Sequence, residues 1–309
     1  MTVFFQTLPF FALMACGYGA ARIGFFSQEA NAALTKFVFY FALSAMLFRF
    51  ASELDLAEMF NADLGMAYFA SLLAVYFMAA IPARLRGRRL GEIAVEGQLA
   101  SIGNNGFLAI PLLLLVLGEA AIPPLLFMLS IDLLIFSSLI VIAIKADQEG
   151  RITRETIGRV LLGVIQNPMV MAMALGLVWA STGLTMPKPA YNFLIMLGSA
   201  ATPCALFAIG ASLAARSAET FAVPLWLSIC KLILHPALAA FFALIVFDLP
   251  SPLAAVMIAT AAMPTAGNIY IIASSYGVAP QRASATILIT HIGAVITLTA
   301  TLAWIVGWS

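Results

Sequence analysis

The sequence predicts an all-α integral membrane protein with ten transmembrane helices, arranged as two inverted repeats of five helices each. Three observations support this fold class. The 309 residues are 63% hydrophobic and only 9% charged, whereas a soluble domain carries about 25% charged residues. Apolar runs of about 20 residues, enough to cross a ~30 Å hydrocarbon core as a helix, recur along the whole chain. Residues of the second half also match residues of the first half at one fixed spacing.

Ten apolar runs are separated by short polar segments or by Gly and Pro. The predicted spans are 3–23, 34–52, 64–83, 92–117, 121–145, 159–181, 190–214, 223–247, 251–277 and 280–307. The longest polar stretch, Lys145 to Arg159, is a loop, so we expect no separate soluble domain. A net charge of +1 gives no reason to expect a nucleic-acid partner.

Basic residues are divided unequally between the two sides that ten spans define. One side holds only Arg49 and Lys188, and Lys231 falls inside a span. The other side holds twelve: Arg22, Lys36, Arg84, Arg86, Arg88, Arg89, Lys145, Arg151, Arg154, Arg159, Arg216 and Arg282. Because cytoplasmic loops are rich in Lys and Arg, we expect the twelve-residue side to be cytoplasmic. Both termini would then be extracytoplasmic, with the protein in the inner (cytoplasmic) cell membrane.

A shift of 159 residues aligns the chain with itself. The clearest matches are Gly17 with Gly176, Gly24 with Gly183, Phe48 with Phe207 and Gly118 with Gly277. Each repeat, 1–150 and 151–309, contains five spans. Because five is odd, the second repeat enters the membrane from the opposite side, and inverted repeats of this kind are a basis for alternating access in secondary transporters.

Spans four and nine are interrupted near their middles. Residues 103–111 read Gly-Asn-Asn-Gly-Phe-Leu-Ala-Ile-Pro, and residues 263–268 read Met-Pro-Thr-Ala-Gly-Asn. Interrupted hydrophobic segments at corresponding places in two repeats indicate the binding site of a secondary transporter. We expect both helices to be broken there and their second half-helices to meet near the membrane midplane, with Pro111 and Pro264 in the first turn of each second half-helix, where proline is tolerated.

Two half-helix N-termini that face one cavity would form an anion site without Arg or Lys. A helix N-terminus carries about +0.5 charge and free N–H groups, and amide side chains add further donors. The candidate substrate-site residues are Asn104, Asn105, Gly106, Pro111, Pro264, Gly267 and Asn268, with Asn105 and Asn268 as the main side-chain donors. The alternative is that the Asn residues only cap the broken helices.

Ionisable residues inside the spans are candidates for ion coupling. Asp132 and His291 occupy equivalent positions in the repeats, because 132 plus 159 is 291. They would carry a coupling proton or form a packing pair. Glu96, near the cytoplasmic start of span four, is an interfacial residue or a further coupling-ion candidate. Lys231 is expected to extend its side chain toward the cytoplasmic surface.

At these motifs the chain resembles the auxin efflux carrier family, which includes plant PIN-type carriers and bacterial transporters and is similar to the bile-acid sodium symporters. The matching segments are 36–43 in span two, 104–111 in span four, 203–210 in span seven and 263–268 in span nine. The resemblance covers the whole chain and implies that the broken spans four and nine cross. One departure is Ser44, which stands where family members often have proline, so we expect span two to be straighter than usual.

The resemblance implies a scaffold of helices 1, 2, 6 and 7 and a moving transport domain of helices 3–5 and 8–10. It also implies organic-anion substrates, elevator-type movement and a homodimer in the lipid bilayer. The sequence contains no recognisable set of residues for nucleophilic catalysis, and neither histidine has a partner at metal-ligand spacing. We therefore expect no enzyme activity, no cofactor and no metal site.

The expected function is secondary transport of a small organic anion, a mono- or dicarboxylate related to malonate or auxin. An alternative is a sodium- or proton-coupled symporter of a larger amphipathic acid such as a bile acid. An alternative of another class is a membrane receptor that binds the same ligand without moving it.

Overall fold

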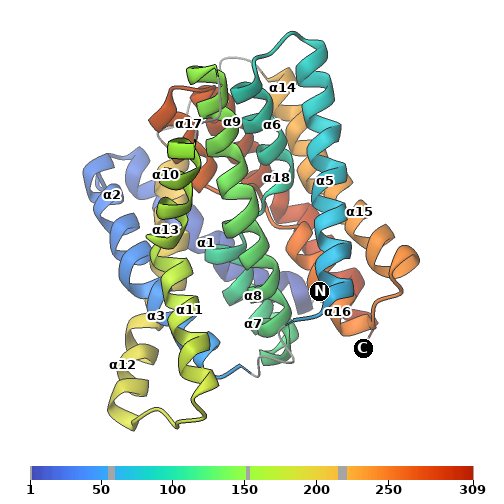
Figure 1. Cartoon of the computed structure of the whole chain (residues 1–309). Helices are drawn as coiled ribbons and strands as arrows, with labels where there is room; N and C mark the ends of the chain where they lie inside the picture. The colour runs from blue at the N-terminus through green and yellow to red at the C-terminus, as the bar shows by residue number, and fades with distance from the viewer. Residues whose placement is uncertain (1, 55–59, 151–153, 215–220, 309) are drawn as a thin grey trace. The chain divides into compact units, whose positions relative to one another are not determined.

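The structure, a computed structural model, describes residues 2–54, 60–150, 154–214 and 221–308 (Figure 1). Within these ranges the regular structure is helical, and the one extended pairing is an isolated antiparallel bridge between Gly103 and Thr265. The prediction of an all-α fold is confirmed for this part of the chain. Arg151 and Arg216, which entered the charge count, lie outside the described residues.

The helices follow the predicted apolar runs. The first half contains α1 (Thr2–Arg22), α2 (Gln28–Phe37), α3 (Leu43–Ser52), α5 (Ala62–Leu85), α6 (Leu90–Ser101), α7 (Ile110–Leu117), α8 (Ile122–Ile131) and α9 (Ser137–Glu149). The second half contains α10 (Arg154–Ile165), α11 (Pro168–Ser181), α12 (Lys188–Ser199), α13 (Ala201–Ala214), α14 (Ala222–Ile229), α15 (His235–Phe241), α16 (Ser251–Ala261), α17 (Asn268–Tyr276) and α18 (Pro280–Val306). Short segments join them: the 3₁₀ turn η3 (Glu119–Ala121) and the π-helical η1 (Val38–Ala42), η2 (Asn105–Ala109), η4 (Asp132–Phe136), η5 (Cys230–Leu234) and η6 (Phe242–Val246).

Six helical runs in the described ranges are long and apolar enough to cross a membrane. They are Gln28–Ser52, Ala62–Leu85, Glu119–Glu149, Lys188–Ala214, Ala222–Val246 and Pro280–Val306. Three shorter apolar helices, Asn105–Leu117, Pro168–Ser181 and Ser251–Ala261, lie in predicted spans four, six and nine. The chain is therefore a multi-pass membrane protein.

Spans two and six are among the predicted spans that differ from regular helices. Span two contains the π-helical turn η1, and the Ser44 hydroxyl donates to the Phe39 carbonyl over 3.0 Å. The expectation that span two is straighter than usual, with serine at position 44, stays a prediction. Span six is divided into α10 and α11, since Asn167 caps the N-terminus of α11 and Pro168 begins it.

The chain divides into two compact units. The first comprises residues 1–61, 106–127 and 165–215, and the second comprises residues 62–105, 128–164 and 216–309. Both units are discontinuous in sequence, because the chain passes between them five times, after residues 61, 105, 127, 164 and 215. Predicted spans one, two and seven fall in the first unit, and spans three, eight, nine and ten fall in the second.

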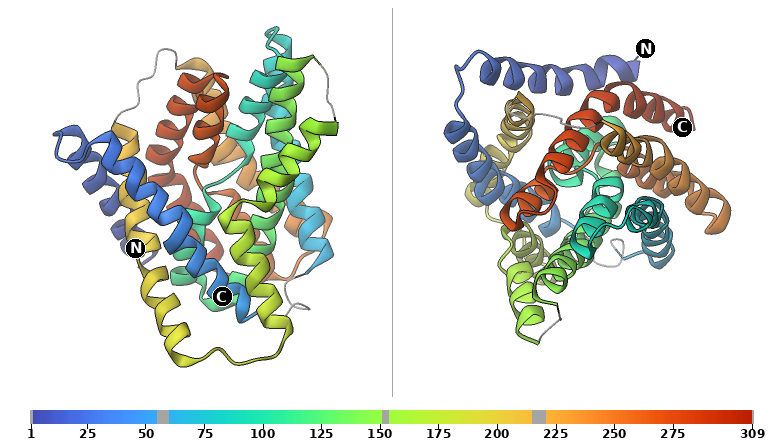
Figure 2. Two further views of the ribbon diagram at one scale, coloured as in Figure 1. Left: turned by 60° about the vertical axis from the view of Figure 1, so that its left-hand side comes forward. Right: turned by 90° about the horizontal axis from the view of Figure 1, so that it is seen from above.

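Close helix packing in the first unit depends on glycine. α1 packs against α13, and α3 packs against α11 (Figure 2). A methyl group on Gly17 would overlap the Phe207 carbonyl oxygen, and a methyl group on Gly176 would lie 2.6 Å from the Phe48 carbonyl oxygen. The 159-residue shift maps Gly17 on Gly176 and Phe48 on Phe207. Each contact therefore joins a glycine of one repeat to the equivalent phenylalanine of the other repeat.

Repeat-equivalent glycines also share a backbone conformation. Gly118 and Gly277 follow α7 and α17 with φ values of 81° and 68°. Gly24 and Gly183 have φ values of 78° and 67°. All four lie in the region that glycine enters without a Cβ penalty.

Candidate functional site

The two interrupted helices of the second unit are joined at their breaks. α6 ends at Ser101 and α16 ends at Ala261, and the non-helical segments that follow them run between helices (Figure 2). The Asn104 N–H donates to the Pro264 carbonyl over 2.8 Å, and the Ala266 N–H donates to the Ile102 carbonyl over 3.1 Å. Backbone groups freed by each break are thus satisfied by the other break, as a membrane interior requires.

Hydrogen bonds of side chains also stabilise this crossing. The Thr265 hydroxyl donates to the Leu99 carbonyl over 2.8 Å, and the Thr265 N–H lies 3.3 Å from the Thr290 hydroxyl that accepts from it. Gly103 has no room for a Cβ, because a methyl group there would lie 2.8 Å from Asn105 Oδ1 and 3.2 Å from Met263 Cβ. A glycine at 103 is therefore needed for the two segments to approach.

The two prolines differ in how they match the positions predicted for them. Pro111 lies in the first turn of α7, which begins at Ile110 directly after η2, as predicted. Pro264 lies in the extended segment before α17, which begins only at Asn268. The prediction failed for Pro264 because the bridge to Gly103 keeps the chain extended through Thr265.

Two of the three asparagines have side-chain amides without a hydrogen-bond partner in the part of the chain that the structure describes. Among the described residues neither Asn104 nor Asn268 has a side-chain hydrogen bond, although the Asn104 residue is only 3% exposed. Asn268 is exposed and is the first residue of α17, with Gly267 as its N-cap. Both amides can therefore donate to a ligand at the crossing.

Asn105 is engaged with Asp132 instead. Its Nδ2 donates to Asp132 Oδ2 over 2.6 Å and lies 3.2 Å from the Tyr68 hydroxyl. The Tyr68 hydroxyl donates to the same carboxylate, 3.1 Å from each oxygen. All three side chains are buried, and Asn105 Oδ1 has no hydrogen-bond partner among the described residues. Tyr68 was missed by sequence reasoning, since a tyrosine in an apolar run gives no signal for its distant partner.

Asp132 is hydrogen-bonded to Asn105 and Tyr68, and His291 to the backbone of its own helix. His291 is buried, and its Nδ1 lies 2.8 Å from the Ile287 carbonyl oxygen of its own helix. The described groups that act on the Asp132 carboxylate are Asn105 and Tyr68 by hydrogen bonding and Lys231 by its charge.

Lys231 does not reach the membrane surface. It lies in η5 and is 0% exposed, so the expectation of a snorkelling side chain was wrong. Its Nζ lies 2.7 Å from the Ala261 carbonyl oxygen and 2.8 Å from His235 Nδ1. A sequence signal existed, because a lysine inside a span with a histidine four residues later places both on one helix face.

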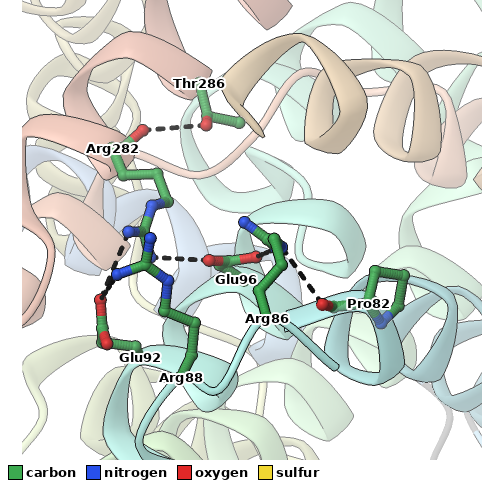
Figure 3. Close-up of polar contacts among 7 residues, drawn as sticks. All are labelled: Pro82, Arg86, Arg88, Glu92, Glu96, Arg282 and Thr286. Carbon is green, nitrogen blue, oxygen red and sulfur yellow. Dashed lines mark hydrogen bonds and ion pairs between the residues drawn. The ribbon is translucent and has the colours of Figure 1, made fainter. Parts of the chain in front are cut away.

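Glu96 belongs to a cluster of charged residues in the second unit (Figure 3). Its carboxylate is 0% exposed, with Arg86 at 2.5 Å from Oε2 and Arg282 at 2.6 Å from Oε1. Arg282 also lies 3.3 Å from Glu92, which Arg88 approaches to 3.6 Å. Since guanidinium groups occupy both oxygens of Glu96, the geometry favours an ion-pair role over a cation site.

The predicted site residues are thus divided between the two units. Gly106 and Pro111 belong to the first unit. There, a methyl group on Gly106 would lie 2.8 Å from Met169 Cε. The other candidates, Asn104, Asn105, Pro264, Gly267, Asn268, Asp132, His291 and Glu96, belong to the second unit.

Residues 2–302 match the family model described as "Membrane transport protein". The chain belongs to this family. The match covers the two broken segments and the buried Asp132 network, and it confirms the resemblance to the auxin efflux carriers. This membrane transport protein is accordingly a transporter and not an enzyme, with a small-molecule substrate and a lipid environment.

Curated relatives extend over almost the whole of this membrane transport protein. A protein of Rhizobium meliloti (strain 1021) named "Putative malonate transporter" is 32% identical over 304 residues, which cover 96% of this chain and 93% of the relative. "Uncharacterized transporter YfdV" of Escherichia coli (strain K12) is 26% identical over 310 residues, covering 96% of each chain. The Shigella flexneri protein of the same name has the same identity and coverage.

Proposed function

We propose that this membrane transport protein is a secondary transporter of a small organic anion, a mono- or dicarboxylate, bound where the segments after α6 and α16 cross. The observation that supports this proposal most is that the two segments pair through Gly103 and Thr265, while the side-chain amides of Asn104 and Asn268 have no hydrogen-bond partner among the described residues. Malonate is the first substrate to test, because the name of the Rhizobium meliloti relative contains it.

The proposed site recognises a carboxylate without a salt bridge. Asn104 and Asn268 each offer an amide donor, and the first turn of α17 offers backbone N–H groups at the positive end of the helix dipole. Gly267, immediately before α17, allows close approach because nothing lies within 4 Å of its Cβ position. Asn105 positions the crossing through Asp132 and does not bind substrate directly.

We further propose that Asp132 couples transport to protons. A charged carboxylate accepts from Asn105 Nδ2, and this leaves Asn105 Oδ1 buried without a donor. A protonated carboxyl group has one O–H to donate, which can serve Oδ1 after the amide turns over. Protonation of Asp132 would thereby change the conformation of the residue next to Asn104.

The wider architecture follows as part of the proposal. It comprises ten spans in a 5+5 inverted repeat, with both termini outside the cytoplasm, the inner membrane as location, a homodimer, and elevator-type movement of helices 3–5 and 8–10 against helices 1, 2, 6 and 7. The corresponding contacts of Gly17 with Phe207 and of Gly176 with Phe48 support the inverted repeat.

A carboxylate screen on purified protein tests the proposed site. Malonate, other short dicarboxylates, monocarboxylates and bile acids are compared for the shift they cause in melting temperature. We expect short carboxylates to stabilise the wild type and to have no effect on the Asn104→Ala, Asn268→Ala double variant. Stabilisation of that variant to the same extent would move the site away from the crossing.

A further inference from the structure

The side chain of Lys231 lies at the C-terminal end of α16 and does not face solvent or lipid headgroups. Its ammonium group is fully buried and donates to the carbonyl of Ala261, the last residue of α16, over 2.7 Å. The second polar neighbour, His235 Nδ1, lies 2.8 Å away and accepts a further hydrogen bond. The Lys231 side chain therefore caps the C-terminus of the half-helix that leads into the crossing.

That position is one where a free cation would otherwise be favoured. The last carbonyl groups of a helix have no intrahelical donor, and a helix C-terminus carries about −0.5 charge. In transporters with broken helices, unwound carbonyls and half-helix C-termini coordinate the coupling Na⁺ or H⁺. At the end of α16 the protein supplies the cation from its own chain.

A buried charge in a membrane needs compensation. The Lys231 ammonium group interacts with the Asp132 carboxylate, which lies in η4 of the same unit. Asp132 in turn is held by Asn105, the residue that follows Asn104 at the crossing. The ammonium group of Lys231 thus contacts the break in span nine, and the carboxylate of Asp132 contacts the break in span four.

We propose that Lys231 is a built-in counter-cation that fills the place of a coupling sodium ion, so that the crossing binds its substrate without Na⁺. His235 is a positioning residue, because its Nδ1 fixes the ammonium group next to the Ala261 carbonyl. The inference rests on the proposed transport function and specifies its ion requirement. It separates this protein from a sodium symporter, which would use a free cation at the same helix end.

The test measures melting temperatures of purified protein without substrate, in NaCl, n-propylammonium chloride or choline chloride at one ionic strength. The variant Lys231→Ala removes the three carbons and the nitrogen that propylammonium contains. We expect the wild type to melt at the same temperature in all three salts. Lys231→Ala should melt lower in choline and should recover most of the loss in propylammonium or NaCl, since choline is too large for the space.

Two further variants separate charge from packing. Lys231→Met keeps the length of the side chain without its charge, so it should melt lower than the wild type and should not recover in any salt. Lys188→Ala, at an exposed position in α12, should behave as the wild type. If Lys231→Ala does not yield folded protein, the wild type and Lys231→Met decide the question.

The proposal is overturned if the wild type is stabilised by NaCl over choline, if Lys231→Met melts as the wild type, or if folded Lys231→Ala responds equally to all three salts. Because no substrate is present, these outcomes are independent of whether any carboxylate is transported. Counterflow of an identified substrate completes the test, and its rate should be equal in sodium and choline media.

Discussion

Asn105 and Asp132 are bound to each other across the second unit, with Nδ2 of the amide 2.6 Å from Oδ2 of the carboxylate. This pair joins a residue of the helix break in span four to an ionisable residue in the middle of span five. Its consequence is that Asn105 acts through Asp132, while the neighbouring Asn104 keeps an amide for a ligand.

We predict that Asn104→Ala and Asn268→Ala each weaken carboxylate binding by at least about tenfold. Loss of one hydrogen bond to a charged group costs about 1.5–3 kcal/mol, and 1.4 kcal/mol corresponds to tenfold. Isothermal titration of purified protein measures the change. Asn192→Ala, at an exposed position of α12, is the matched control and should bind as the wild type. Unchanged affinity in both site variants would make these asparagines helix caps only.

Asp132→Asn should abolish uptake that is driven by an imposed pH gradient but spare exchange of substrate for substrate. The asparagine keeps the size and an acceptor for Tyr68 and cannot gain or lose a proton. Uptake by the wild type should increase when the entry side is more acidic, because a proton then loads onto the carboxylate on that side. Paired proteoliposome assays with and without the gradient measure both activities. Gradient-driven uptake by Asp132→Asn, or a wild type that ignores the gradient, would assign Asp132 to packing.

Glu96→Gln should lower the free energy of unfolding by about 1.5–3 kcal/mol, because it weakens hydrogen bonds from two guanidinium groups. Glu92→Gln is the control within the same cluster. Its side chain is 26% exposed, so we expect an effect below about 1 kcal/mol. Denaturation in detergent micelles compares the two variants, and equal effects would show that burial of Glu96 is unimportant.

Gly17→Val and Gly176→Val should destabilise the protein to similar extents, since each would press a side chain into the backbone of the facing helix. Overpacking of this kind costs about 1–3 kcal/mol or more. Gly19→Val provides the control, because nothing lies within 4 Å of its Cβ position. A large loss at one glycine and none at its equivalent would argue against the correspondence of the two repeats.

Reporter fusions after residues 87, 150 and 309 test the orientation. We expect cytoplasmic reporters at the first two positions and an extracytoplasmic reporter at the third, as the distribution of basic residues predicts. A cytoplasmic C-terminus would remove the odd span number on which the inverted repeat depends.

Sequence reasoning located the breaks because Gly, Asn and Pro interrupt an apolar run visibly. It placed the start of α17 too early, since the extended segment through Thr265 is maintained by a bridge to Gly103 that is distant in sequence. It also paired Asp132 with His291 by repeat position, whereas Tyr68 and Asn105 bind the carboxylate. Tertiary hydrogen bonds between separate spans leave no periodic pattern, and the burial of Lys231 depends on where α16 ends.

The most direct test of organic-anion transport at the crossing is counterflow of radiolabelled malonate in proteoliposomes that contain an excess of unlabelled carboxylate inside. The account predicts transient accumulation of label with the wild type and with Asn192→Ala, and loss of accumulation with the Asn104→Ala, Asn268→Ala double variant. Exchange of other short carboxylates with the same dependence on Asn104 and Asn268 would change only the identity of the substrate. Carboxylate binding without exchange by the wild type, or undiminished exchange by the double variant, would contradict the account.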